Sequence, residues 1–354
     1  GMEKSINFSS DNTAGVASKI LDSVIDAANI SSMPYGDDPY TLKLQILANE
    51  VFEREVFIYP VATGSAANAL ALASVSPPYG IVFCHSQSHI EEDECAAPEF
   101  YMGGGKLSLL EGENAKISAS NLQEKLNNQS PAPLVHRAQP AVVSITQATE
   151  LGTVYTIDEI LAISEVCKQN NLPLHMDGAR LANAVVALGT TVADCTWRAG
   201  VDILSLGATK NGAMAAEVII FFNTKLAYEA KNKIKQTGHV ISKTRFISAQ
   251  LNAWFKDGLW VKLAKSANNN AKYLSDQLSL FRDFKLLYPT EGNEVFLKIE
   301  KKTYDQILKL KIIPNLWSKV NDDELVIRFV TSFETQKSQI DELIKRLSNQ
   351  FIKT

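Results

Sequence analysis

The stretch that decides the fold runs from Leu172 to Gly212 and reads LPLHMDGARLANAVVALGTTVADCTWRAGVDILSLGATKNG. A short apolar run ends at Asp177, an alanine-rich helical pattern covers 179–188, and a second apolar run, 201–206, leads to Lys210. Strand, helix and strand in this order are typical of α/β proteins, whose ligand-binding groups gather at the carboxyl ends of parallel strands. We therefore predict that Asp177 and Lys210 project into one crevice.

An acid and an amine in one crevice suit pyridoxal phosphate. This cofactor needs a lysine for its Schiff base and a carboxylate that keeps the pyridine nitrogen protonated, which makes the ring an electron sink. Gly207 and Gly212 flank Lys210, and glycine leaves the backbone free to approach a ring closely. The alternative is that Asp177 and Lys210 are ordinary solvated or ion-paired charges. The cofactor interpretation therefore requires a phosphate site and a ring-stacking group upstream.

Length and composition limit the possible classes of protein. The chain has 354 residues, enough for two domains or for one large α/β domain with a smaller appendage. A net charge of -4 and a pI near 5.8 argue against nucleic acid or an anionic membrane as the main partner. The cysteines are far apart and show no metal-site spacing, which predicts a reduced, cytoplasmic protein. They are Cys84, Cys95, Cys167 and Cys195.

A possible phosphate site lies between residues 56 and 74. The short β-branched and aromatic run 56–60 is followed by Thr63-Gly64-Ser65-Ala66-Ala67-Asn68 and then by an alanine- and leucine-rich helical pattern. A strand, a small-residue turn and a helix amino end form an anion site, because free N–H groups and the helix dipole both face the ligand. The pattern is not GxGxxG, so a dinucleotide-binding motif is absent.

Two histidines follow the next predicted strand, 81–83. His85 and His89 stand four residues apart, which would allow a zinc site on one helix face. However, both lie where a loop leaves the strand, and Ser86 stands where zinc enzymes with paired helical histidines carry Glu. The other interpretation is that a planar imidazole lies on an aromatic cofactor ring and transfers protons.

The alternation of strand and helix ends near residue 250. Strands are predicted at 141–146 and 218–222, and a long helix is predicted over 251–280. Short strands near 285–288, 295–300 and 325–330 then suggest a smaller α+β domain. We therefore predict a large domain over 1–250 and a small domain over 251–354. Arg328 lies inside the last apolar strand and should need a carboxylate partner.

Taken together, these motifs resemble the L-threonine aldolases, fold type I pyridoxal phosphate enzymes within the β-eliminating lyase group. The resemblance spans nearly the whole chain and is most specific at His175-Met176-Asp177-Gly178-Ala179-Arg180 and Gly207-Ala208-Thr209-Lys210-Asn211-Gly212. It implies an α/β protein of the aspartate-aminotransferase-like fold. This fold has a large domain with a mostly parallel seven-stranded sheet and a smaller C-terminal α+β domain.

The resemblance also implies roles for single residues in cofactor binding. Lys210 matches the Schiff-base lysine, Asp177 the partner of the pyridine nitrogen, and His89 the histidine stacked on the ring. The turn that cradles the phosphate matches Gly64, Ser65 and Ala66. No resident metal is implied.

For the substrate, Arg180 and Arg328 resemble the clamp on the α-carboxylate, helped by Ser10, and Arg180 also borders the cofactor site. His136 resembles a second histidine near the substrate hydroxyl, so His89, His136 and a bound water are all candidates for the base.

Tyr35 resembles a residue supplied by a neighbouring subunit. Arg245 or a nearby lysine resembles a residue that reaches the partner's phosphate. The resemblance thus implies a homo-oligomer, a dimer or tetramer with shared active sites.

The implied activity is retro-aldol cleavage of L-threonine, L-allo-threonine or related β-hydroxy-α-amino acids to glycine and an aldehyde. The segment Thr146-Gln147-Ala148-Thr149-Glu150-Leu151-Gly152 departs from the Glu-Asn-Thr-His-like element of many family members, which leaves the preference at the β-carbon open. The alternatives are a phenylserine-preferring aldolase, a fold type I lyase acting by β-elimination, a non-catalytic relative and a metal hydrolase that uses His85 and His89.

Overall fold

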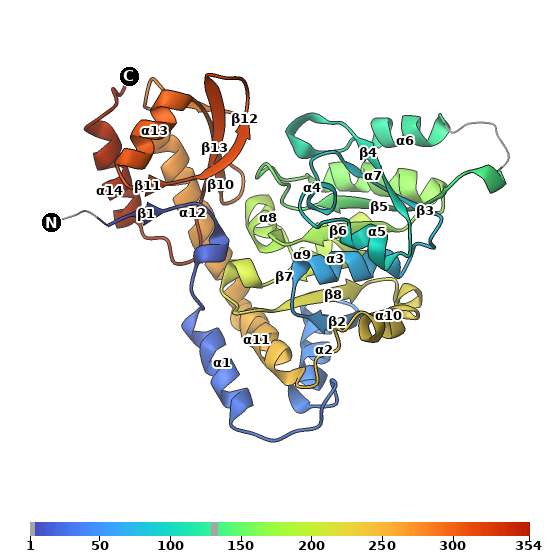
Figure 1. Ribbon diagram of the computed structural model, residues 1–354. Helices are drawn as coiled ribbons and strands as arrows, with labels where there is room; N and C mark the ends of the chain where they lie inside the picture. Colours follow the sequence, from blue (N-terminus) through green and yellow to red (C-terminus); the bar gives the residue numbers. More distant parts are fainter. Residues whose placement is uncertain (1–3, 129–133) are drawn as a thin grey trace.

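A seven-stranded sheet forms the centre of the larger part of the computed structural model, which describes residues 4–128 and 134–354 (Figure 1). The strand order is β2-β8-β7-β6-β5-β3-β4. Strand β8 is antiparallel to both of its neighbours, and the other pairs are parallel. The strands are β2 (Phe57–Val61), β3 (Gly80–His85), β4 (Lys106–Leu110), β5 (Gln139–Thr146), β6 (Leu174–Gly178), β7 (Ile203–Gly207) and β8 (Glu217–Phe221).

Helices cover both faces of this sheet, because its central strands are apolar on both faces. On β8, Val218 and Ile220 belong to the core that includes α7, α8 and α11, whereas Ile219 and Phe221 pack with α3 and α10. The helices of this part are α1 (Ser18–Ala28), α2 (Pro39–Val51), α3 (Gly64–Ala73), α4 (His89–Glu92), α5 (Ala97–Tyr101), α6 (Ala119–Asn127), α7 (Ile157–Gln169), α8 (Leu181–Leu188), α9 (Val192–Cys195), α10 (Ala230–Gln236) and α11 (Arg245–Phe255).

The C-terminal part is a four-stranded antiparallel sheet with the order β12-β13-β10-β9, packed with three helices (Figure 1). Its elements are α12 (Leu259–Leu278), β9 (Lys285–Leu286), β10 (Glu294–Glu300), α13 (Lys301–Lys309), β12 (Asn315–Lys319), β13 (Glu324–Val330) and α14 (Lys337–Ser348). The N-terminal strand β1 (Ile6–Asn7) crosses to this part and pairs in parallel with β11 (Ile312–Ile313). The predicted fold class, with a mostly parallel seven-stranded sheet and a smaller α+β part, is confirmed.

The predicted long helix over 251–280 is wrong. Helix α11 ends at Phe255, and α12 begins at Leu259. Between them, Asp257 and Gly258 have φ values of 55° and 68°, a left-handed conformation that an α-helix does not continue through. Phe255 and its neighbours still pack in the core of the large sheet, although they lie beyond residue 250. The domain boundary at residue 250 stays a prediction.

All four cysteines are free. Within the described part of the chain, no helix combines the length and the apolar character needed to cross a membrane.

Candidate active site

A hollow of about 340 Å³ lies where several strands of the large sheet end. Asp177 near the end of β6 and Lys210 just after β7 both line it, so the two residues share one crevice as predicted. The short 3-10 turn Thr209–Asn211 carries Lys210, and Gly212 follows it with a φ of 105°. Lys210 forms no ion pair within residues 4–128 and 134–354, so its amine is available to a ligand.

Asp177 is a buried carboxylate that accepts hydrogen bonds from neutral groups. The backbone N–H of Ala179 donates to Oδ1 at 3.1 Å, and Asn68 Nδ2 donates to Oδ2 at 3.1 Å. Only 4% of the residue is exposed, and none of the ion pairs among described residues includes it. A buried charge of this kind is stabilised by a positively charged donor. A protonated pyridine nitrogen fits this requirement.

The amino end of α3 borders the same hollow. The Thr63 hydroxyl caps the helix by accepting from the Ala66 N–H at 3.1 Å. The first N–H groups of any helix have no intrahelical partner, and here Gly64 and Ser65 line the hollow. A Cβ on Gly64 would lie 3.0 Å from Glu217 Oε1, so a side chain would crowd this turn. The arrangement fits a phosphate group.

Glu217 is a residue of this hollow that the sequence analysis missed. It lies on β8, and its Oε2 accepts from the Ala208 N–H at 2.9 Å and from the Thr209 hydroxyl at 3.2 Å. Burial raises its pKa to about 7, although nearby Lys210 acts in the opposite direction. The carboxyl thereby holds the loop that carries Lys210.

His89 stands at the opening of the hollow, at the start of α4. Its Nδ1 lies 3.2 Å from Glu94 Oε2, and this hydrogen bond raises the pKa of His89. Asn68, which also donates to Asp177, donates to Glu94 at 3.3 Å. His89 is thus fixed by an acid beside the hollow, and its stacking on a cofactor ring stays a prediction.

His85 and His89 do not form a pair of metal ligands. His85 Nε2 lies 2.8 Å from the Gly112 carbonyl oxygen, and its Nδ1 accepts from the Gln87 N–H at 3.0 Å. Both ring nitrogens of His85 are therefore occupied by the backbone. Among the described residues, no group of three or more His, Cys, Asp and Glu is placed to hold a metal ion.

A second hollow, of about 560 Å³, adjoins the first and shares five lining residues with it; it is called the outer hollow below. Ser10, Arg328 and Trp317 line it, and Arg180 and Lys210 line both hollows. The three residues predicted to hold a substrate carboxylate therefore lie in the same place, beside the predicted anchor lysine.

The two arginines already pair with protein carboxylates. Arg180 donates two hydrogen bonds to Asp11, at 2.8 and 2.9 Å, and lies 3.0 Å from Glu294. Arg328 lies 3.2 Å from the same Glu294 oxygen and donates to the Ser9 carbonyl oxygen at 3.1 Å. Burial lowers the pKa of Arg328 and would lower that of Arg180, but Asp11 and Glu294 raise the pKa of Arg180 overall. The predicted carboxylate partner of Arg328 is therefore Glu294.

Glu150 also lines both hollows and was not singled out from the sequence as a site residue. It follows β5 and is 9% exposed. Its Oε1 accepts from the backbone N–H of His89 at 2.9 Å. The Thr146 hydroxyl lies near enough to lower the pKa of Glu150, but no described group makes a hydrogen bond of ordinary geometry to Oε2. Burial and the nearby charge of Asp177 outweigh Thr146 and raise the pKa to about 7.

The placement predicted for His136 is wrong for the site of its own chain. His136 is exposed, on a 3-10 turn that precedes β5, whereas both hollows lie beyond the other end of that strand. A strand of this length spans about 26 Å at roughly 3.3 Å a residue. The prediction overlooked that a residue before a strand and a residue after it lie at opposite edges of the sheet.

Tyr35 and Arg245, the residues predicted to act across a subunit interface, line neither hollow. Tyr35 is 57% exposed in the loop between α1 and α2. Arg245 is buried and donates to the carbonyl oxygens of Ala27 and Ile30 at 3.1 and 3.2 Å. Their roles toward a partner subunit stay predictions.

Comparison with known proteins decides the family. The family model described as β-eliminating lyase matches residues 7–302. The chain belongs to this family. The low specificity L-threonine aldolases of a Pseudomonas species and of Pseudomonas aeruginosa are 37% and 38% identical to it. The first alignment covers 96% of both chains, and the second covers 85% of this chain and 86% of the relative.

Solved structures agree with this assignment. The Leishmania major threonine aldolase has a TM-score of 0.90 at 28% identity and covers 97% of this chain and 98% of its own. A Sphingomonas wittichii serine palmitoyltransferase, 11% identical with a TM-score of 0.72, covers 98% of this chain and 86% of its own and shows the shared fold alone. This β-eliminating lyase family member is a fold type I enzyme and a pyridoxal phosphate-dependent lyase.

Proposed function

We propose that this lyase cleaves L-threonine, L-allo-threonine and related β-hydroxy-α-amino acids to glycine and an aldehyde. The observation that carries the proposal is that Lys210 and Asp177 line one hollow, which continues into a second hollow beside Arg328. Two relatives that are 37% and 38% identical and are named low specificity L-threonine aldolase support the choice of substrate.

The first hollow, called the cofactor hollow below, would hold the cofactor in this proposal. Lys210 would bind it covalently, Asp177 would hold the proton on the ring nitrogen, and the amino end of α3 at Gly64, Ser65 and Ala66 would bind the phosphate. His89, fixed by Glu94, covers the ring. When bound, pyridoxal phosphate supplies an electron sink for the pair released from the Cα–Cβ bond.

The outer hollow holds the substrate carboxylate. Arg328 and Ser10 contact it, because both line this hollow and Arg328 has an Nε with no partner among the described residues. Arg180 also borders the hollow, but Asp11 and Glu294 already engage its guanidinium. Arg180 therefore adds positive charge and fixes the two acids, while Arg328 makes the more direct contact.

The test is a product analysis after the purified protein has been loaded with pyridoxal phosphate. Threonine, allo-threonine and phenylserine are supplied in turn, and glycine, aldehyde, 2-oxo acid and ammonia are measured. Equal amounts of glycine and aldehyde are expected. Formation of 2-oxo acid and ammonia instead would establish the rival β-elimination, and a clear rate advantage for phenylserine would establish an aryl preference.

We also propose that the enzyme is a cytoplasmic homo-oligomer, a dimer or a tetramer. Large apolar side chains are exposed along α1, α2 and the loop between them, and their burial in a subunit contact would be favourable. They are Leu21, Ile25, Ile30, Met33, Leu42 and Ile46. Tyr35 lies in the same loop and would face the partner. Sedimentation tests the oligomeric state directly, since an active monomer would contradict a dimer or a tetramer.

A further inference from the structure

The group that takes the proton from the β-hydroxyl is left open by the sequence. Of the two candidate histidines, His136 lies at the opposite edge of the sheet. His89 is held by Glu94, and their hydrogen bond raises the pKa of His89. Glu94 thus occupies one of the two ring nitrogens of His89.

Glu150 is better placed than either histidine. Among the described residues it is the one acid that lines both the cofactor hollow and the outer hollow. Oε1 is fixed by the His89 N–H, which sets the orientation of the carboxyl. Oε2 is buried and has no hydrogen-bond partner of ordinary geometry among the described residues. A buried carboxylate oxygen without a partner is costly, and it gains one when a hydroxyl donates to it.

We propose that Glu150 Oε2 accepts the proton of the substrate's β-hydroxyl during cleavage, an inference that rests on the proposed function. The O–H bond breaks and its electron pair becomes the second bond of the aldehyde carbonyl. The Cα–Cβ bond breaks and its pair stays with Cα, which later takes a proton to give glycine. The proton on Glu150 passes to solvent through the outer hollow, and this restores the carboxylate.

The surroundings of Glu150 suit this role. Burial and the charge of Asp177 raise its pKa to about 7, so the carboxyl can gain and lose a proton near neutral pH. Of the other titratable groups, His89, Arg180 and Lys210 line both hollows. Asp177 and Glu217 line the first hollow alone, and Glu92, Asp93 and Arg328 line the outer hollow alone. Cleavage through Glu150 should therefore rise with pH up to about 7 and fall by about tenfold for each unit below it.

The test compares Glu150→Gln with the matched control Glu91→Gln. Glutamine keeps an acceptor for the His89 N–H but cannot take the proton, and Glu91 is exposed on α4 and lines neither hollow. Three quantities are measured in each protein: binding of pyridoxal phosphate by its visible absorbance, exchange of the glycine α-proton with D2O by NMR, and aldehyde release from threonine between pH 5.5 and 9. Exchange on glycine requires the cofactor and the carboxylate site but no β-hydroxyl.

In Glu150→Gln we expect cofactor binding to be unchanged and glycine exchange to stay within about threefold. Aldehyde release should fall by about 10² to 10⁴, the usual scale of general-base catalysis, and should lose its rise toward pH 7. Glu91→Gln should match the wild type. Loss of less than tenfold in aldehyde release, or an equal loss of exchange and release, would overturn the role of Glu150. If the wild type exchanges glycine but releases no aldehyde, the proposed function itself fails, and the inference falls with it.

Discussion

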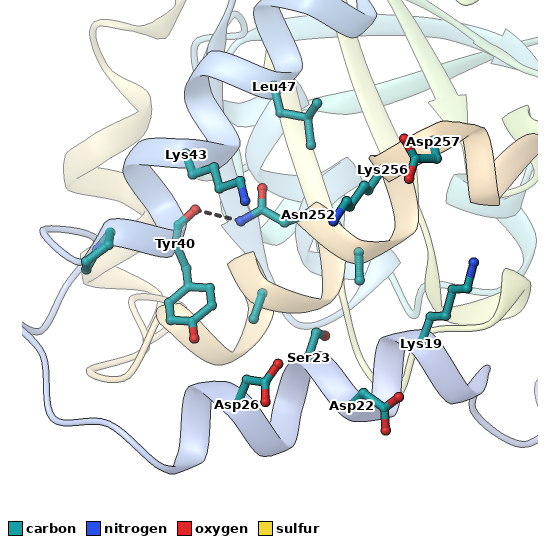
Figure 2. Close-up of a pocket in the computed structure, with 13 residues that line it drawn as sticks. Lys19, Asp22, Ser23, Asp26, Tyr40, Lys43, Leu47, Asn252, Lys256 and Asp257 are labelled. Carbon is teal, nitrogen blue, oxygen red and sulfur yellow. Dashed lines mark hydrogen bonds between the residues drawn. The ribbon is translucent and has the colours of Figure 1, made fainter.

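Two cavities of nearly equal volume, the outer hollow and a groove elsewhere on the molecule, differ in how their charged side chains are held. The outer hollow and a groove between α1, α2 and α11 each measure about 560 Å³. Figure 2 shows the groove. In the groove, Lys43 and Lys256 are exposed and join no ion pair among the described residues. In the outer hollow, Arg180 and Arg328 are largely buried and share Glu294. Buried and paired charge, rather than volume, therefore distinguishes the candidate active site.

The largest expected effect is the loss of cofactor binding and activity when Lys210, rather than a lysine of the groove, is replaced. Lys210→Ala should abolish the visible absorbance of bound cofactor and lower aldehyde release by at least about 10⁴, the scale seen when a covalent catalytic group is removed. Lys43→Ala, in the groove, should leave both unchanged. Absorbance spectra and rates on threonine check this pair, and a Lys210→Ala protein with a normal spectrum would remove the distinction between the two regions.

A smaller effect is expected from the outer hollow. Arg328→Ala should raise the KM for threonine by about 10- to 100-fold, because a charge-assisted hydrogen bond contributes roughly 1.5–3 kcal/mol. The cofactor should remain bound, since Arg328 does not line the cofactor hollow. Lys256→Ala is the matched groove variant and should keep its KM. Loss of cofactor from Arg328→Ala would place this arginine at a different part of the site.

The pH dependence of stability provides a third contrast. His175 is fully buried between the Ser144 and Ser205 hydroxyl oxygens at 2.8 and 2.9 Å, and burial lowers its pKa to about 4. Since the folded pKa lies below the unfolded value of 6.5, the stabilisation is complete above pH 6.5 and is lost as pH falls toward 4. The loss should reach about 3 kcal/mol.

Chemical denaturation from pH 4 to 8 measures the slope of the free energy of unfolding against pH. His175→Asn should flatten it, whereas Asp26→Asn, which changes an exposed acid of the groove, should leave it as in the wild type. An unchanged slope in His175→Asn would mean that the histidine is not held neutral by the sheet.

The smallest expected effect is a loss of stability when a hydrogen bond in the groove is removed. Asn252 Nδ2 donates to the Tyr40 carbonyl oxygen at 2.9 Å, the hydrogen bond drawn in Figure 2. Asn252→Ala should lower the free energy of unfolding by about 1 kcal/mol and leave cofactor absorbance intact. A loss of absorbance in this variant would show that the groove and the cofactor hollow are coupled.

The sequence predicted the part of the site that follows from local pattern. Asp177, Lys210, Gly64 and His89 each stand just after or at the end of a strand, and parallel strands bring their carboxyl ends together. The prediction for His136 was wrong for the site of its own chain because His136 precedes its strand and lies at the other edge of the sheet. The break between α11 and α12 had a local signal, the pair Asp257-Gly258 inside the predicted helix, which marks a turn.

Asp11 and Glu294 could not be predicted in the same way. Asp11 pairs with Arg180, which lies 169 residues later, and Glu294 joins Arg180 to Arg328. Such pairs depend on how β1, β6, β10 and β13 meet in space, and no local spacing encodes that. Glu150 does follow β5, as the predicted residues follow their strands, but its unpartnered oxygen is visible only once the surrounding atoms are placed.

The most direct test of the central claim is to locate the lysine that bonds to pyridoxal phosphate. The loaded protein is reduced with borohydride, digested and analysed by mass spectrometry. We predict that the pyridoxyl label is found on Lys210. A label on a groove lysine such as Lys43 or Lys256, with Lys210 unmodified, would contradict it.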